Sequence, residues 1–364
     1  MGKKKSSTPP ESFLLLPSPP SSLPIVDTHT HLASTFSFYR TRYKSGTYTS
    51  VHEFAQAMYA GRQVEAIVDV WCEAEAPAQG LWREFADSAL RAEDRERVWG
   101  GMEYWFVMGV HPHEAKLYTD DVETHILEAM AHPRCVGWGE IGLDYHYTLS
   151  PRDTQQAVFA RQLRHAVRLG KPLTIHTREA EEDTERILKA EVPREHKIHI
   201  HCFTDSPAFA ARLLAHFPNL YIGITGVITY TTNPNTSGVI RNLVSSPSSR
   251  GPTSEPQSQP HLRILLETDA PYMVPANLYD SLLEMKGKLP LCHSAMVPWT
   301  AAFVARVARE VEAAGAGAGE VGAGEGQGKG AGAGEGEGEG ESGEWTADRV
   351  MREARENARR VYGV

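Results

Sequence analysis

The sequence VDTHTH at residues 26–31 decides how we interpret the fold. It follows the apolar residues Leu23–Val26 and turns polar at once, as happens where a buried parallel strand ends at a functional face. Alternate residues of a strand share a face, so the pattern predicts Asp27, His29 and His31 side by side. Two neutral imidazoles in this arrangement can hold one divalent cation. For a single His-x-His motif, polar residues at a loop entrance are an equal alternative, so the rest of the chain must decide.

Apolar runs and amphipathic stretches alternate along the chain after this motif. The further predicted strands are Val64–Trp71, Trp105–Val110, Cys135–Ile141, Pro172–His176, Lys197–His201, Leu220–Ile224 and Arg263–Glu267. The predicted helices include Gln79–Arg97, Val122–Met130, Pro151–Leu169, Thr184–Glu191 and Pro207–His216. Strands and helices that alternate over roughly 250 residues predict an α/β fold, a (β/α)8 TIM-like barrel in a single domain. A doubly wound open sheet is the alternative.

A barrel places its chemistry at the C-terminal ends of the strands, and this can be tested on the sequence. Imidazoles and carboxylates do stand at that end of six predicted strands. They are His29 and His31, His111 and His113, Glu140, His176, His201, and Asp269. A lone histidine is more often a core residue with a satisfied hydrogen bond. Six such positions at one end of one barrel favour a functional site.

The donor set contains nitrogen and oxygen, which suits Mg²⁺, Mn²⁺ or Zn²⁺. Four histidines, one glutamate and one aspartate exceed what one tetrahedral ion takes and suit two bridged ions. We expect His29, His31 and Asp269 to hold one ion, His176 and His201 the other, and Glu140 to bridge. Two such ions lower the pKa of bound water toward about 7 and supply a metal-activated hydroxide. Asp269 is then the candidate general base.

The chain resembles the TatD family of metal-dependent deoxyribonucleases, within the amidohydrolase-like barrel superfamily. The motifs that carry the resemblance are DTHTHL, GVHPH, GEIGLDY, IHTRE, HCF and ETDAPY, and residues 356–362 resemble the last helix of the family. The resemblance covers about residues 24–364, apart from insertions. It implies a divalent-metal centre and hydrolysis of phosphodiester bonds of DNA, often from the 3′ end. The ligands that it implies are His29, His31, Glu140, His176, His201 and Asp269.

Other residues invite roles beside the ligands. Arg178 shares a strand face with His176 and is a candidate to clamp the scissile phosphate, with an ion pair to Glu179 or Glu181 as the alternative. His111 and His113 are candidates to bind phosphate or protonate the leaving oxygen, and packing beside Pro112 explains them equally well. Aromatic residues are candidates to stack on bases of a single strand, namely Tyr145, Trp138 and Tyr272, although core packing explains Trp138 at least as well.

Composition bounds the setting of this barrel. Residues 1–22 are rich in Pro, Ser and Lys and predict a disordered leader; its start fits a myristoylation pattern, for which a disordered basic tip is the preferred alternative. The barrel is expected over residues 23–364, with flexible insertions at 245–260 and 315–344. The second insertion carries seven acidic residues and one lysine, so it accounts for six of the nine net negative charges. The net charge therefore says little against nucleic acid as a partner.

The sequence leaves three functions to compare. The first is a 3′-5′ exonuclease on DNA, preferably on single strands or 3′ ends. The second is a hydrolase of small amides or lactones, disfavoured because such barrels often use a carbamylated lysine where Glu140 stands. The third is a scaffold that keeps the metal site and recruits protein partners through its insertions. Four cysteines without Cys-x-x-Cys pairing predict a reducing compartment, the cytoplasm with the nucleus as an alternative. Because no apolar run approaches the roughly 20 residues of a membrane-spanning helix, we expect no stable membrane association.

Overall fold

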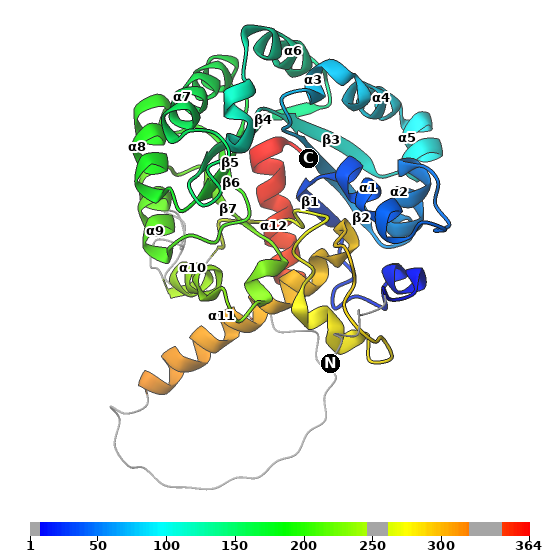
Figure 1. Cartoon of the computed structure of the whole chain (residues 1–364). Helices are drawn as coiled ribbons and strands as arrows, with labels where there is room; N and C mark the ends of the chain where they lie inside the picture. Colours follow the sequence, from blue (N-terminus) through cyan, green and yellow to red (C-terminus); the bar gives the residue numbers. More distant parts are fainter. Residues whose placement is uncertain (1–7, 246–260, 320–343) are drawn as a thin grey trace, which may run out of the picture.

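A computed structural model describes residues 8–245, 261–319 and 344–364, with side chains omitted for 315–319. Its sheet has eight parallel strands in the order β1 to β8, as the sequence predicts for a (β/α)8 barrel. The strands are β1 (Ile25–Thr30), β2 (Val64–Trp71), β3 (Glu103–Met108), β4 (Cys135–Asp144), β5 (Leu173–Arg178), β6 (Ile198–Ile200), β7 (Leu220–Ile224) and β8 (Ile264–Leu266). Figure 1 shows them as a ring inside the helices. The prediction of a TIM-like barrel is confirmed.

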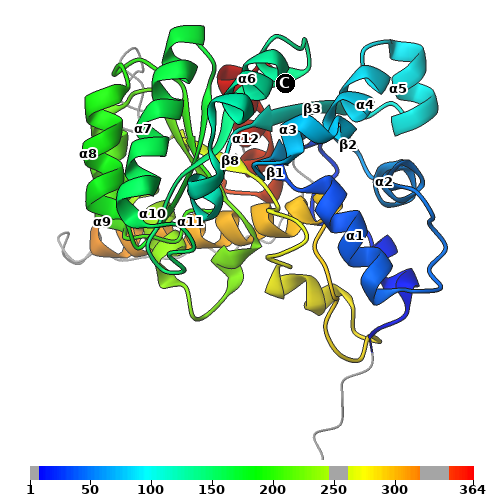
Figure 2. The same cartoon turned by 45° about the horizontal axis from the view of Figure 1, so that its top comes forward.

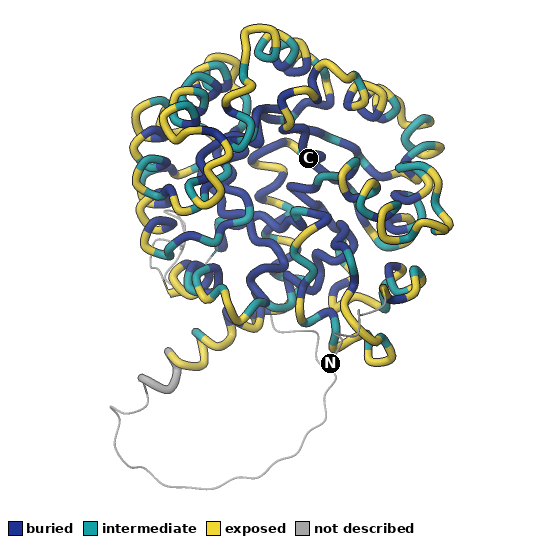
Figure 3. Tube along the Cα trace, viewed as in Figure 1, coloured by how far each residue is buried: buried dark blue, intermediate teal, exposed yellow. Residues whose placement is uncertain are grey.

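The helices form the outer layer of the barrel (Figures 1 and 2). They are α1 (Leu32–Arg42), α2 (Val51–Tyr59), α3 (Ala76–Gln79), α4 (Leu81–Ser88), α5 (Ala92–Trp99), α6 (Asp120–Met130), α7 (Arg152–Leu169), α8 (Glu181–Glu191), α9 (Pro207–His216), α10 (Pro234–Ser245), α11 (Val297–Gly319) and α12 (Ala347–Tyr362). Short 3-10 helices are η1 (Glu11–Leu15), η2 (Pro112–Leu117), η3 (Gly226–Thr229), η5 (Ala276–Ser281) and η6 (Ser294–Met296). Figure 3 shows buried strands within and exposed residues on the outer faces of the helices.

The barrel closes between β8 and β1 through side chains as well as backbone. Asp269 N–H donates to the His29 carbonyl at 2.9 Å. The Asp27 carboxylate accepts from the backbone N–H and the hydroxyl of Thr268, at 3.0 and 2.6 Å. The prediction that Asp27 shares a working face with His29 is therefore wrong. A register irregularity between Asp27 and Thr30 breaks the alternation on which that prediction depended.

One predicted helix is divided, and several helices of the structure, α1 and α2 among them, were not predicted. The predicted helix over residues 79–97 is divided into α4 and α5. The Ala89 carbonyl between them accepts hydrogen bonds from the side chains of Arg95 and Arg134, so it does not accept the backbone N–H that a continuous helix would supply. Residues 32–59 contain α1 and α2, which are not among the predicted helices. Helix α2 begins with a capping box in which Ser50 and Glu53 satisfy each other's backbone N–H groups.

The predicted leader is ordered in the part that the structure describes. Residues 11–15 form η1, and Leu14 is fully buried against the barrel. Glu11 accepts hydrogen bonds from the Tyr39 hydroxyl and from the backbone N–H of Thr47. The prediction of disorder is wrong for residues 8–22, because amino-acid composition contains no information about the contacts of Leu14 and Glu11 with the barrel. Residues 1–7, and with them the myristoylation pattern, lie outside the described residues.

Helix α12 closes the N-terminal end of the barrel and lies in the centre of the view in Figure 1. The Asn357 side-chain amide donates to the carbonyls of Leu262 and Ile264 at 2.7 and 2.9 Å. Val361 and Tyr362 join the buried cluster inside the lower barrel, with Val26, Ala66 and Leu265 among its members. The predicted insertions fall mostly on 246–260 and 320–343, outside the described residues, although α11 continues to Gly319. Over the described ranges, none of the helices combines the length and apolar character needed to cross a membrane.

Candidate metal centre

Glu140, near the C-terminal end of β4, stands at the centre of the predicted site. One carboxylate oxygen, Oε1, lies 2.7 Å from His201 Nε2, 2.9 Å from His176 Nδ1 and 3.3 Å from His111 Nε2. The other oxygen, Oε2, lies 3.4 Å from His29 Nε2 and 3.7 Å from His31 Nε2. The two oxygens thus face two different sets of imidazoles, which is the geometry that a bridging carboxylate needs.

Asp269 completes the set around His29 and His31. Its Oδ1 lies 3.7 Å from His29 Nε2 and 3.5 Å from His31 Nε2. The backbone of Asp269 has φ of 52°, a left-handed conformation that is uncommon outside glycine. Cys202 and Glu179, which follow β6 and β5, share this feature with φ of 41° and 54°. Outliers of this kind gather where a site must turn a side chain inward, and they mark this end of the barrel.

The donor atoms form groups compact enough to hold cations. The potential ligand atoms lie within 4.8 Å of one another in three groups, which are His29–His31–Asp269, His29–Glu140–His201 and His111–Glu140–His176. All six predicted ligands are therefore brought together from strands far apart in the sequence. The donor chemistry of neutral imidazole and carboxylate fits divalent cations such as Zn²⁺, Mn²⁺ or Mg²⁺. His111 joins them, which the predicted division between the two ions did not include.

The charges of these groups are strongly coupled. Burial would raise the pKa of Glu140, but attraction to His201 and His111 holds it well below its usual range. Burial lowers the pKa of His29 to about 4. Its ring stacks on that of His201 with centroids 3.9 Å apart, an arrangement that disfavours a charge on both rings. For His31, burial acts to lower the pKa, but the hydrogen bond and charge of Asp269 raise it to about 9. Cations and protons therefore compete for the same nitrogens, and metal affinity should depend on pH.

Asp144 is a site residue that the sequence reasoning missed. Its Oδ2 lies 2.8 Å from His113 Nε2 and 3.3 Å from His176 Nε2. A carboxylate behind a ligand imidazole fixes the orientation of the ring and raises its basicity. Asp144 stands four residues after Glu140 in the same strand, so period-two alternation at the end of β4 was the signal available. His113 is thus held by Asp144, whereas the neighbouring His111 points at Glu140.

Arg178 is free to meet an anion. Among the residues that the structure describes, no carboxylate lies within ion-pair distance of it; Glu179 pairs with His146 at 2.6 Å, and Glu181 accepts from Ser206 at 2.7 Å. The ion pair predicted as the alternative for Arg178 is therefore absent. Its guanidinium lies 4.9 Å from the ring centroid of Tyr147, and it lines the same cavity as His176, His201 and Asp269.

The candidate stacking residues divide into buried and exposed ones. Trp138 is fully buried, and its indole N–H donates to Gln162, so of its two interpretations core packing is confirmed and base stacking is excluded. Tyr145 is half-buried with its hydroxyl on Asp183 at 2.8 Å. Tyr272, three residues after Asp269, is 59% exposed and is the only one of the three predicted rings with a free face.

A second polar layer lies beneath the centre, inside the barrel. Tyr362 Oη from α12 lies 2.9 Å from His199 Nδ1 and 2.6 Å from Thr174 Oγ1. His199 Nε2 is 2.8 Å from Glu267 Oε2, close enough for an ion pair but poorly aligned for a hydrogen bond. Gly223 leaves the space for this pair, since a Cβ there would lie 2.4 Å from Glu267 Oε1. His199 itself is fully buried in the core.

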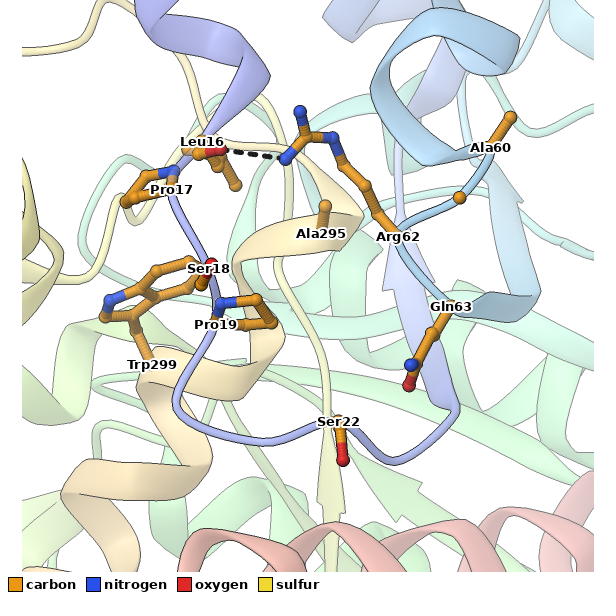
Figure 4. A pocket seen from close by; sticks show the side chains of 11 residues that line it. Leu16, Pro17, Ser18, Pro19, Ser22, Ala60, Arg62, Gln63, Ala295 and Trp299 are labelled. Carbon is orange, nitrogen blue, oxygen red and sulfur yellow. Dashed lines mark hydrogen bonds between the residues drawn. The ribbon is translucent and has the colours of Figure 1, made fainter.

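A cavity at the other end of the barrel offers no comparable chemistry (Figure 4). It has a volume of about 500 Å³ and lies between residues 16–22 and the loop before β2. Arg62 is its only charged lining residue among the described ones, and the guanidinium donates to the Leu16 carbonyl at 3.0 Å. The side chains that could bind metal lie at the C-terminal ends of the strands instead.

Comparison with known proteins assigns a family to this arrangement. Residues 26–363 match the family model described as TatD related DNase. A human protein named 3′-5′ RNA nuclease TATDN2 is 34% identical over 307 residues, which cover 84% of this chain and 35% of that protein. A protein of Escherichia coli named 3′-5′ ssDNA/RNA exonuclease TatD is 32% identical over 174 residues, covering 48% of this chain and 60% of that protein. The matches thus span about a third and three fifths of these two relatives.

Solved structures show the same fold. A TatD family hydrolase from Entamoeba histolytica superposes with a TM-score of 0.62 and 14% identity, covering 93% of this chain and 98% of that one. At this identity the likeness speaks for the barrel and leaves the chemistry to the side chains described above.

Proposed function

The chain belongs to the family of TatD-related DNases, and from that premise we propose that it is a divalent-metal-dependent 3′-5′ exonuclease on single-stranded nucleic acid. The observation that carries the proposal is the position of Glu140, whose two oxygens face two sets of donors at one end of the barrel. The names of the human and E. coli relatives, which contain RNA and ssDNA/RNA, support a nucleic-acid substrate. DNA, which the sequence resemblance suggests, is one of the two substrates to test, and RNA is the other.

The six predicted ligands would hold two cations. His29, His31 and Asp269 would hold one, His176 and His201 the other, and Glu140 would bridge them, with His111 as a further donor beside Oε1. Bound cations of this kind activate water as a nucleophile near neutral pH and stabilise charge on a phosphate. The protein supplies the fixed positions of the donors and, through Asp144, the orientation of His176.

The remaining roles belong to side chains around this centre. Arg178, unpaired by any described carboxylate, would bind the non-bridging oxygens of the phosphate by two N–H donors. Asp269, already a ligand, would accept a proton from the attacking water. His113, oriented by Asp144 and 27% exposed at the mouth, would donate a proton to the leaving oxygen.

The test is metal-dependent hydrolysis of 5′-labelled single strands of DNA and of RNA of one sequence. We expect shortening from the 3′ end with Mg²⁺ or Mn²⁺, none with chelator, and a loss in kcat on the order of 10³ for Asp269→Asn, the scale of removing a group that acts in the transition state. The ratio of kcat/KM for the two strands gives the preferred sugar.

Two other outcomes would redirect the interpretation. Turnover of a small amide or lactone, with every nucleic acid left intact, would favour the small-molecule hydrolase. Metal uptake without hydrolysis of any of these substrates would favour a scaffold. Either result would overturn the nuclease proposal.

A further inference from the structure

A groove leads away from the metal centre on one side. Its inner part is a cavity of about 370 Å³ that touches His176, His201 and Asp269 and is walled by Arg178 and residues 232–235. Its outer part is a cavity of about 680 Å³ that continues to Tyr272 and Lys288. The two cavities share Thr232 and Met273 in their walls, so they lie side by side. We call the two together the long groove.

A second hollow opens on another side of the same centre. It has a volume of about 270 Å³ and is lined by His31 together with Asp69, Glu73 and Glu75. We call it the acidic cleft. Both hollows reach the ligand set, so each is a candidate path for a substrate chain that extends beyond the scissile bond.

Resting on the proposed function, we propose that the long groove is the binding site for the polynucleotide strand. The phosphodiester to be cleaved lies at the metal centre beside Arg178, and the nucleotides on its 5′ side extend past Thr232 and Met273 toward Tyr272 and Lys288. The acidic cleft stays free of the strand.

Electrostatics separates the two paths. Each nucleotide adds a negative phosphate, and neutralising phosphates with Lys or Arg is the main source of affinity for nucleic acid. The long groove begins at Arg178 and ends at Lys288, and Asp269 is its only acidic lining residue among those that the structure describes. The acidic cleft presents three carboxylates and no lysine or arginine in its described lining. A strand in that cleft would meet like charge.

The lining of the long groove also suits an unpaired strand. Tyr272 exposes 59% of its surface at the wall, which leaves a ring face for a base. The Tyr272 N–H donates to the Asp269 carbonyl at 3.1 Å, so the ring is tied to the metal centre by one turn of backbone. At the junction Met273 offers a flexible apolar side chain that adapts to different bases.

The walls of the long groove are joined to each other before any strand binds. The Tyr230 hydroxyl donates to the Val274 carbonyl at 3.0 Å, and the Ala276 N–H donates to the Thr229 hydroxyl at 2.7 Å. Gly226 packs so closely on this loop that a Cβ would lie 2.0 Å from the Met273 carbonyl oxygen. A groove formed in advance loses less entropy on binding.

The proposal is tested by binding of the full-length protein to a fluorescein-labelled single-stranded octanucleotide, measured by anisotropy with chelator to prevent turnover. Tyr272→Ala should weaken binding about tenfold, as expected for loss of one stacked base. Lys288→Ala should weaken it and lower the slope of log Kd against log salt by about 0.7, the value for one phosphate contact on a single strand. Lys286→Ala is the matched control, an exposed lysine two residues away that does not line the groove.

Glu75→Ala in the acidic cleft tests the direction of the strand. The proposal expects binding unchanged or tighter, because a like charge is removed. Weaker binding by Glu75→Ala, or equal binding by wild type, Tyr272→Ala and Lys288→Ala, would overturn the long groove as the site. These results are separable from the proposed function. If the wild type cleaves the octanucleotide and both groove variants bind normally, only the proposal of the long groove is contradicted. If the wild type binds through Tyr272 and Lys288 but cleaves nothing, only the proposed nuclease function is contradicted.

Discussion

Two glutamates, Glu140 and Glu267, are both buried inside the barrel, but their pKa values shift in opposite directions. Glu140 is 3% exposed and Glu267 is 0% exposed. Burial acts to raise the pKa of both. For Glu140, attraction to His201 and His111 outweighs burial and holds the pKa well below its usual range. For Glu267, burial prevails and the pKa rises to about 7, although His29 and His201 act to lower it.

The difference follows from the neighbours of each carboxylate. Glu140 has three imidazole nitrogens within 3.3 Å of Oε1 and two more near Oε2. Glu267 has the backbone N–H of Cys202 and one imidazole, His199, whose own pKa is lowered well below its usual range by burial and by the charge of His201. A buried carboxylate keeps its charge only among enough positive or donating groups. We call the residues around Glu140 the upper layer and those around Glu267 and His199 the lower layer. The upper layer therefore stabilises a charged carboxylate, whereas the lower layer fills the interior of the barrel.

The largest predicted effect separates these two layers directly. Glu140→Gln removes the negative charge shared by both sets of donors, so we expect nuclease activity to fall by about 10³ or more and bound metal to be lost. Glu267→Gln should keep kcat within about tenfold. Kinetics and metal content by elemental analysis measure both variants side by side. Equal losses in the two variants would show that the lower layer takes part in the reaction.

A third buried carboxylate, Asp69, sharpens the comparison because it accepts from neutral donors and, among the described residues, has no imidazole within hydrogen-bond distance. It accepts from the Leu32 N–H at 2.8 Å and the Tyr104 hydroxyl at 2.7 Å. Burial raises its pKa from 3.8 to about 6. Between about pH 4 and 6 the folded protein therefore binds the extra proton, and the contribution of Asp69 to the free energy of unfolding falls as pH rises, by up to about 3 kcal/mol.

Asp69→Asn should remove this pH dependence while retaining an acceptor for one donor. The measurement is urea unfolding of both proteins in chelator between pH 4 and 7, and the quantity is the difference in free energy of unfolding at each pH. The variant should lose stability relative to wild type at low pH and recover it above pH 6. A constant difference across this range would mean that the donors keep Asp69 ionised in the folded protein.

The fold was predictable because the barrel repeats one simple pattern. Strand β7 (Leu220–Ile224) and helix α9 (Pro207–His216) have the bounds that apolar runs and a proline start predict. The divided helix and the ordered leader, which the sequence did not predict, depend on contacts between residues far apart in the sequence. The carbonyl of Ala89 is taken by Arg134, which comes from a distant turn, and Glu11 anchors the leader on Tyr39. A local pattern cannot contain either contact.

The sequence was sufficient to predict which residues of the candidate site converge. It was not sufficient to predict how their side chains are oriented. Strand ends placed Glu140 and the histidines together, because parallel strands of a barrel end on one face. The separate orientations of His111 and His113 depend on Asp144 and on a 3-10 turn, η2, that begins between them. Asp27 fails for the related reason that one irregularity in register reverses a strand face.

The smallest predicted effect concerns the hydroxyl that supports the lower layer from α12. Tyr362→Phe removes two hydrogen bonds, to His199 and Thr174, while leaving the ring in the apolar cluster. We therefore expect the free energy of unfolding to fall by about 2 kcal/mol, from a net value of about 1 kcal/mol for each bond. The control is Tyr221→Phe, in the same cluster, whose hydroxyl has no hydrogen-bond partner within the described part of the chain. Urea unfolding measures both, and kcat should stay within twofold of wild type. If Tyr362→Phe instead reduces kcat tenfold at unchanged stability, the two layers act as one, because α12 would then set the position of His201 and Glu140 through His199.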